Sequence, residues 1–524
     1  MRISALLRNQ HNRIPSRPFS PRPTSLFEKQ RQEIDRLTRE NRDLRKRVAE
    51  DRKRIAELEK KADLLKNLEK EAEERDKKIN ELEHQLAGRK KNSSNSSKPP
   101  SSDGPAADKR IHPQRKKSGR KPGGQKGHIG KYRALIPTEK ADKVIEVFPS
   151  SCMCGHRFAK NGKDLCKTGK THRHQVTELP EMRPHTTEYQ FWEVICPDCG
   201  KVIWAPVPKE ILNQFGPKLT ALLAYLTVVC RMPRRKMEEL LENVLATPIS
   251  LGSTQKAVEE TSTALQTGCQ ELEQQLSKEP VLNGDETGWR SDGAKRWLWV
   301  LVARNFVFFM VAMSRSSEVL YQLLGPQFLG ILCTDRFGAY IKYHKGMAQF
   351  CWAHLKRDLL GIQQFARTTV ADRFARDALA LHARFFRLWH RFRNGDLDRD
   401  QLILKSKPLE KKFFALSENH LDCADGEVRK LARFFFRHTE KLFAFIRYPN
   451  VDPTNNISER ALRTAVQWRK TSFGNRSRNG EIATARLLTA AGTCNVQGRN
   501  ILEFLTETVR LHRAGLPTPS LFPQ

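Results

Sequence analysis

The amino-acid sequence predicts a multidomain α+β protein. The observations behind this are a long charged heptad pattern near the N-terminus, two cysteine pairs that bracket a short segment, and a change from helical to strand periodicity near residue 280. The chain has 524 residues, too many for one hydrophobic core, so we expect several domains. Its 93 Lys and Arg residues against 59 Asp and Glu residues favour a polyanionic partner, because cations that neutralise phosphates release condensed counterions.

The chain shows no sign of a membrane anchor or of secretion. No stretch reaches the roughly 20 apolar residues that a membrane-spanning helix needs. Residues 1–26 are rich in Arg and Ser and lack the apolar segment of a secretory signal, so they predict a disordered basic arm. The 11 cysteines are spread along a long chain and indicate reduced thiols and metal ligands, which are typical of a cytoplasmic protein.

Residues 27–87 predict a long helix with a heptad pattern. Ile34, Leu37, Leu44 and Val48 open a series of apolar residues at alternating spacings of three and four, with Asn41 at a core position. Charged residues fill the other positions. A single solvated helix is the alternative, but so polar a helix buries its apolar seam only against a partner, so we expect a parallel coiled-coil dimer.

Residues 88–133 are rich in Ser, Pro and Gly, and their basic residues far outnumber their acidic ones. Such a composition builds no core and predicts a disordered basic linker. The same segment is suited to follow a phosphate backbone, with Arg120, Lys121 and Lys126 of "GRKPGGQKGH" as DNA contacts. The two interpretations are compatible.

Residues 134–208 predict a small β-rich module that binds zinc. Cys152 and Cys154 lie at one end and Cys196 and Cys199 at the other, in "SCMCGHRF" and "VICPDCGK". Two thiolates two residues apart, followed by a glycine that permits a tight turn, are typical of a zinc knuckle. The C-x-C spacing of the first pair is tighter than usual, and the alternative is four buried free thiols. The spare candidate ligands are Cys166, His156, His172 and His174.

Residues 209–279 predict several helices, one of which begins at the start signal Ser-x-Gly-Ser of residues 250–253. Two short helices, a turn and a third helix fit a DNA-binding helix-turn-helix. They fit packing helices equally well, and both interpretations stay open.

From residue 280 the pattern becomes that of strands. "PVLNGDETGW", "WLWVLVA" and "FVFFMVAM" predict three strands, of which the first two are joined by a hairpin turn centred on Asp-Gly. "SSEVLYQLLG" predicts a helix, and "FLGILCTDRFGAY" predicts a fourth strand that ends at Asp335. This β-β-β-α-β order is how a ribonuclease-H-like domain begins. We expect that domain over residues 280–480, with a helical insertion at about 345–450 and a helical segment at 481–524.

In that strand order, the first and fourth strands are neighbours, which brings Asp285 beside Asp335. Two carboxylates so close repel each other unless a cation lies between them. Mg²⁺ or Mn²⁺ suits such oxygen ligands, and two ions clamp both oxygens of a phosphoryl transfer. Glu459, on a helix that starts after Pro453, is the candidate third carboxylate. Glu286 points to the opposite face of a regular strand and is not expected to be a ligand.

Other polar residues near these acids have a role and an alternative each. His354 in "FCWAHLKRDLL" contacts DNA or moves a proton, or it lies on the polar face of a packing helix. A second group consists of basic residues that contact phosphates or are ordinary surface charges. These are Arg463, Arg469, Lys470 and Arg476.

A series of motifs resembles the transposases of the insertion sequence 66 family over about residues 30–510. They are "NSSNSSKPPSSD", "GRKPGGQKGH", the paired cysteines, "DETGWR" before "WLWV", "TDRFGAY", "CWAHLKRDL", "NNISERALR" and "RKTSFGNRS". The resemblance implies a DDE-type transposase of a bacterial insertion element, with Asp285, Asp335 and Glu459 as its metal-binding triad. It also implies double-stranded DNA as partner, both element ends and target, small companion proteins of the same element, and a nucleoid-associated location in the cytoplasm.

The same sequence supports other functions less well. A non-catalytic DNA-binding regulator would use the coiled coil, the basic arm and the zinc module. A structural nucleoid protein would bind DNA without end preference. The strand order that ends on Asp335 argues against both. Another ribonuclease-H-like nuclease or an integrase is the nearest alternative enzyme.

Overall fold

The computed structural model describes residues 24–90, 127–130, 133–158, 166–211 and 213–522. Most of the predicted basic arm lies outside these residues, as do the expected DNA contacts Arg120, Lys121 and Lys126. The chain divides into two units, Met1–Lys90 and Lys91–Gln524. No helix in the described ranges is both long and apolar enough to cross a membrane.

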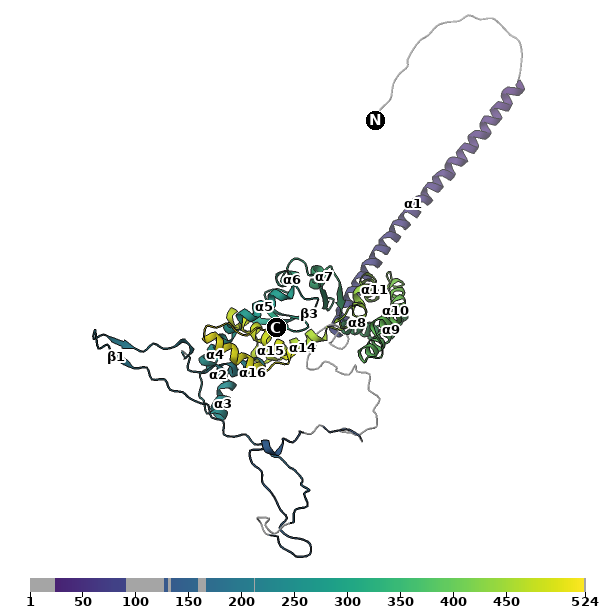
Figure 1. The fold of residues 1–524 in the computed structure, drawn as a ribbon. Coiled ribbons are helices and arrows are strands. Elements are labelled where there is room, and N and C mark those ends of the chain that lie inside the picture. The colour runs from purple at the N-terminus through teal and green to yellow at the C-terminus, as the bar shows by residue number, and fades with distance from the viewer. Residues whose placement is uncertain (1–23, 91–126, 131–132, 159–165, 212, 523–524) are drawn as a thin grey trace. The chain divides into compact units, whose positions relative to one another are not determined.

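The described part of the first unit is one helix, α1 (Thr24–Lys90), drawn in purple in Figure 1. It confirms the helix predicted over residues 27–87. The apolar side chains of the heptad seam are exposed in the single chain, with Ile34 63% exposed and Leu44 57% exposed. A coiled-coil partner would bury this seam, and the dimer stays a prediction.

The second unit begins with a segment that packs little. Its regular elements are the short helices η2 (Thr138–Lys140) and η3 (Lys209–Ile211) and the strands β1 (Glu193–Ile195) and β2 (Val202–Trp204). The two strands pair antiparallel, and their side chains are exposed. In the part of this segment that the structure describes, the predicted β-rich module is therefore a single hairpin.

Four helices follow, as the pattern over residues 209–279 predicted. They are α2 (Pro217–Val228), α3 (Arg234–Leu245), α4 (Leu251–Ala264) and α5 (Gln266–Leu276). The hydroxyl of Ser250 caps α4 by accepting the N–H of Ser253 at 3.1 Å, which confirms the predicted start signal. Arg513 of the C-terminal helix α16 (Ile501–Arg513) pairs with Glu260 of α4 at 2.7 Å and donates to the carbonyl of Phe215, just before α2.

A five-stranded sheet forms the centre of the second unit. Its strands are β3 (Val281–Ser291), β4 (Ala294–Val302), β5 (Val307–Ala312), β6 (Ile331–Thr334) and β7 (Ala348–Phe350), in the order β5-β4-β3-β6-β7. β3 pairs antiparallel with β4 and parallel with β6, and helix α6 (Ser317–Leu324) connects β5 to β6. The predicted β-β-β-α-β order is thus present, and β7 adds a strand that was not predicted.

The hairpin between β3 and β4 turns at Asp292 and Gly293, with φ values of 50° and 72°. Both lie in the left-handed region, which is what the tight turn predicted from Asp-Gly requires.

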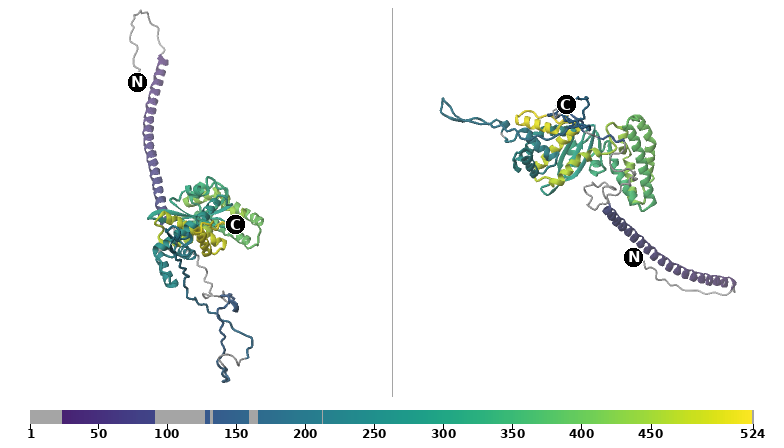
Figure 2. Two further views of the ribbon diagram at one scale, coloured as in Figure 1. Left: turned by 60° about the vertical axis from the view of Figure 1, so that its left-hand side comes forward. Right: turned by 90° about the horizontal axis from the view of Figure 1, so that it is seen from below.

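A helical insertion lies between β7 and α14 (Asn456–Ser472) (Figure 2, green). Its helices are α8 (Trp352–Gln364), α9 (Thr369–Arg393), α10 (Arg399–Glu418), α11 (Gly426–Arg437), α12 (Thr439–Leu442) and α13 (Ala444–Arg447). They share an aromatic core around Trp352, Phe413 and Phe443. Phe350 of β7 belongs to the same core, so the insertion is packed onto the end of the sheet.

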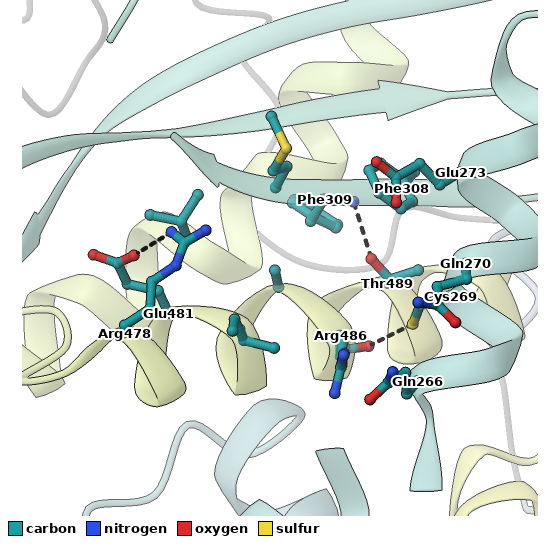
Figure 3. A pocket seen from close by; sticks show the side chains of 14 residues that line it. Gln266, Cys269, Gln270, Glu273, Phe308, Phe309, Arg478, Glu481, Arg486 and Thr489 are labelled. Atoms are coloured by element: carbon teal, nitrogen blue, oxygen red, sulfur yellow. Dashed lines mark hydrogen bonds and ion pairs between the residues drawn. The ribbon is translucent and has the colours of Figure 1, made fainter. Parts of the chain in front are cut away.

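Helix α15 (Arg478–Gln497) covers the free edge of β5. The hydroxyls of Thr489 and Thr493 accept the backbone N–H groups of Phe309 at 2.9 Å and Val307 at 3.1 Å (Figure 3 shows the first of these). An edge strand otherwise exposes unpaired N–H groups, so these threonines close the sheet. Helix α15 belongs to the packing of the sheet, although most of it lies beyond residue 480, where the predicted ribonuclease-H-like domain ends.

We expect Thr489→Val and Thr493→Val to loosen this edge. Valine keeps the shape of threonine but leaves a buried N–H unsatisfied, which costs about 1–3 kcal/mol for each group. Hydrogen exchange at the Phe309 and Val307 amides should become faster, and the denaturation midpoint should fall. Thr508→Val is the matched control, because the Thr508 hydroxyl bonds only the Phe504 carbonyl of its own helix. Equal exchange in all three variants would contradict the edge role.

Candidate active site

Two of the predicted acids lie at the same end of the paired segment of strands β3 and β6. Asn283 lies opposite Cys333 in the parallel register. Asp285 and Asp335 each follow that pair by two residues, so they lie on adjacent segments where the pairing ends. The structure therefore places these acids as the strand order predicted.

The two adjacent acids of β3 point to opposite faces of the sheet, as expected for a regular strand. On the face of Asp285, the neighbouring Thr287 accepts from Arg469 of α14 at 3.2 Å. On the other face, Glu286 accepts from the hydroxyl of Tyr340 in α7 (Gly338–Tyr343). Asp285 therefore belongs to the face that α14 covers.

The carboxyl group of Asp285 lies in an unfavourable environment for a negative charge. Burial raises its pKa well above the usual range, and the charges of Glu286, Asp335 and Glu459 raise it further. A hydrogen bond from the Glu286 N–H at 2.8 Å opposes this rise. The pKa of Asp335 is also raised, mainly by burial, although the Phe337 N–H donates to its carboxylate at 2.9 Å. The charges of Arg315, Arg336 and Arg357 also oppose the rise in the pKa of Asp335.

Glu459 lies in the first turn of α14, with a side chain 37% exposed. The start of this helix is fixed to β3 by Asn455, whose amide donates to the Gly284 carbonyl at 2.7 Å, next to Asp285. The backbone N–H of Asn455 also donates to the Cys351 sulfur at 3.1 Å. Asn455 therefore sets where Glu459 stands relative to Asp285, a role that the sequence analysis missed.

Two side chains from α8 reach Glu459. Arg357 approaches its carboxylate at 3.4 Å, and Nε2 of His354 lies 3.7 Å away. Burial, assisted by the charges of Arg357 and Arg336, lowers the pKa of His354 to about 3. Its Nδ1 makes no hydrogen bond to any residue that the structure describes. His354 is therefore a neutral imidazole at physiological pH, and it lies at the candidate site.

Glu286 has partners that Asp285 lacks. Arg315, from the loop after β5, donates through Nε at 2.7 Å and approaches the same oxygen with a second nitrogen at 2.5 Å. The Arg315 guanidinium lies 3.8 Å from the centre of the Phe337 ring. Because the Phe337 N–H holds Asp335, the buried Glu286 cluster supports the loop that carries Asp335. No local pattern in the sequence marks Arg315 as part of the site.

The four basic candidates of α14 and its following loop differ in their surroundings. Arg469 donates to Thr287 and to the Gly288 carbonyl, so it ties α14 to β3. Arg463, Lys470 and Arg476 are exposed and available to a partner.

The cysteine pairs form two similar turns. The N–H of Gly155 donates to the Cys152 carbonyl and that of Gly200 to the Cys196 carbonyl, both at 2.9 Å. Hydrogen bonds from the backbone of Cys154 and Cys199 lower the thiol pKa of Cys152 and Cys196, respectively. Cys196 is half-buried and the other three are exposed, so they are not buried thiols.

Neither metal site is assembled as a compact cluster. Among the residues that the structure describes, no three His, Cys, Asp or Glu side chains are grouped so that they could hold a metal ion. The two cysteine pairs are thus not brought together. The three acids are near enough for their charges to affect Asp285, but they do not form a closed set of ligands.

Comparisons with known proteins agree with the motifs. Residues 213–482, more than half of the chain, match the family model described as Transposase IS66 family. Residues 28–134 match a family of unknown function, DUF6444. The uncharacterized protein y4qI of Sinorhizobium fredii (strain NBRC 101917 / NGR234) is 26% identical over 43% of this chain and 46% of its own length. The uncharacterized protein y4hP of the same strain is 23% identical over 68% of this chain and 69% of its own length. The chain thus spans about half the length of the first relative.

The acids make a prediction about stability. Because the pKa of Asp285 is raised by folding, the folded protein binds this proton more tightly than the unfolded chain does. Stability therefore falls as the pH rises above the ordinary carboxylate range near about pH 4. We expect Asp285→Asn to raise the denaturation midpoint at neutral pH and to weaken this pH dependence. The exposed Asp377 of α9 provides the control, Asp377→Asn. A midpoint that does not rise in Asp285→Asn would contradict the electrostatic picture.

Proposed function

Because this chain belongs to the IS66 family of transposases, we propose that it cuts the ends of an insertion element and joins them to target DNA. The observation that carries the proposal is the approach of Asp285, Asp335 and Glu459 at the edge where β3 and β6 part. A basic chain with a small acidic centre suits an enzyme that acts on a nucleic-acid backbone.

The sheet supports a ribonuclease-H-like assignment for the core. An antiparallel meander, β3 to β5, is followed by α6 and by β6, which lies parallel beside β3. In this assignment, the first acid lies on the central strand, the second follows the neighbouring strand, and the third comes from a helix beyond the insertion.

The three acids are suited to hold Mg²⁺ or Mn²⁺. All are hard oxygen donors, and the mutual repulsion that raises the pKa of Asp285 is what a bound cation would relieve. When bound, the ions would polarise the phosphate and activate the attacking oxygen. The side chain of Glu459 is partly exposed, so it could leave Arg357 and complete the ligand set as DNA binds.

The proposed reaction has two in-line transfers without a covalent enzyme intermediate. In the first, a water oxygen attacks the phosphorus at the element's end, and the bond to the 3′ oxygen breaks to leave a 3′-hydroxyl. In the second, that 3′ oxygen attacks a phosphodiester of target DNA, whose own 3′ oxygen leaves. Arg357 lies beside Glu459, where it can hold a phosphate near the acids. Because its pKa is lowered to about 3, His354 stays neutral and can donate one hydrogen bond and accept another.

DNA is held, in this proposal, by exposed cations outside the acidic centre. Arg463, Lys470 and Arg476 are exposed on α14 and the loop after it. Such contacts position the duplex and carry no sequence information themselves. Arg120, Lys121 and Lys126 remain candidates for the same role.

We further propose that Cys152, Cys154, Cys196 and Cys199 bind Zn²⁺ as a structural ion. Each pair already lies in a turn closed by a glycine, and the lowered thiol pKa of Cys152 and Cys196 favours the thiolate that zinc requires. Binding requires the two turns to come together. In this proposal the chain also self-associates through α1 and acts with companion proteins of the same element. It acts on bacterial DNA in the cytoplasm.

The decisive experiment compares the intact protein with Asp285→Asn on DNA that carries the element's ends. With Mg²⁺, the intact protein should leave 3′-hydroxyl ends at the element boundary, and the variant should be at least about 100-fold slower, because a lost ligand removes several kcal/mol of transition-state stabilisation. Asp377→Asn should cut normally. Full cleavage by Asp285→Asn would remove this acid from the site. End-specific binding without cleavage would favour the non-catalytic regulator.

Zinc binding is tested by metal analysis of the purified protein. A stoichiometric zinc ion should be present and should be lost in Cys152→Ser and in Cys196→Ser. Cys230→Ser is the control, because Cys230 is exposed and lies outside both turns. Zinc retained in the first two variants would exclude the four-cysteine site.

A further inference from the structure

A strongly basic hollow of about 410 Å³ lies between helix α11 and the loop that follows β6. Within the described ranges, no acidic residue lines it. The residues that give it its character are Arg336, Arg429, Lys430, Arg433, Phe434 and Arg437. Like charges so close repel one another, although Arg336 pairs with the carboxylate of Asp358 and Arg433 with that of Asp422.

The packing of α11 explains why these cations lie together. Arg429, Arg433 and Arg437 are spaced by four residues, so they follow one another along one face of the helix. The opposite face, with Val428, Leu431 and Phe435, is buried in the aromatic core of the insertion. The buried face therefore fixes the basic face toward the hollow.

Some of these cations already bond to neighbouring residues, and others do not. Arg429 donates to the Cys423 carbonyl at 2.7 Å, and Arg433 pairs with the exposed Asp422 at 2.9 Å. Lys430 and Arg437 are exposed, and neither forms a hydrogen bond or an ion pair within the ranges that the structure describes. These two side chains are available to a ligand.

The hollow adjoins the candidate active site through Arg336. This residue directly follows Asp335, pairs with Asp358 at 2.9 Å, and lies 5.7 Å from the centre of the Phe434 ring on α11. One loop thus carries an acid of the proposed site on one side and a wall of the hollow on the other.

We propose that this hollow binds consecutive phosphates of the DNA duplex next to the phosphodiester on which the acids act. The inference rests on the proposed function and names a surface for its substrate. The stripe from Arg429 to Arg437 rises about 12 Å along the helix, which is longer than one phosphate group. Duplex DNA carries one charge per about 1.7 Å of its axis, so it supplies a matching row of anions.

The salt dependence of DNA binding tests this surface. The full chain and the double variant Lys430→Gln/Arg437→Gln are titrated with a duplex of the element's end at several salt concentrations. Each lost phosphate contact should reduce the slope of log K against log salt by about 0.9, so the double variant should lose about 1–2. The matched control is Arg384→Gln/Lys412→Gln, which removes two exposed cations of the same insertion outside the hollow.

Equal slopes in the two double variants would overturn the proposal. That result is also expected if the hollow binds an acidic polypeptide and not DNA. Duplexes with neutral methylphosphonates then locate the contact. A methylphosphonate within a few nucleotides of the element boundary should weaken DNA binding by the intact protein. It should not weaken binding by the Lys430→Gln/Arg437→Gln variant. If only methylphosphonates far from the element boundary have this selective effect, the hollow does not bind DNA beside the acids.

The same measurements separate this inference from the proposed function. Binding slopes need no cleavage, so a reduced slope in a protein that never cuts would support the hollow and count against the transposase activity. Asp285-dependent cleavage with an unchanged slope would do the reverse.

Discussion

Two adjacent carboxylates in the central strand of a sheet constrain everything around them. A buried charge is costly unless it is paired, and Asp285 and Glu286 meet this cost differently. Glu286 is bonded to Arg315 and Tyr340 on one face of β3. Asp285, on the other face, has further acids as neighbours. The Glu286 carboxylate therefore belongs to the hydrogen-bonded framework of the fold, whereas the Asp285 carboxylate would be stabilised by a bound cation.

The framework transmits this arrangement to distant parts of the chain. Asn455 joins the start of α14 to β3 and to Cys351, and Arg469 ties the later turns of the same helix to β3. These bonds hold the helix that carries Glu459 along the strand that carries Asp285. The aromatic core of the insertion lies beside this junction and shares Phe350 with the sheet. The site is thus held by hydrogen bonds on the side of the strands and partly exposed to solvent at Glu459.

The sequence was informative where structure follows from local periodicity. Short apolar runs and an Asp-Gly turn predicted β3 and β4, and the alternation of side chains along a strand separated Asp285 from Glu286. β7 escaped prediction because three residues carry no period. The roles of Arg315 and Asn455 depend on contacts between residues far apart in the chain, which no local pattern encodes.

The insertion also determines the order in which the proposed ligands are synthesised. Asp285 and Asp335 are made before α8 to α13, and Glu459 only after them. A ribosome that stops early therefore releases a chain with two of the three proposed ligands and without the Asn455 anchor. Such fragments would retain the N-terminal basic segments but lack α14 and Glu459. The proposed set of ligands is therefore complete only after the whole insertion has been synthesised.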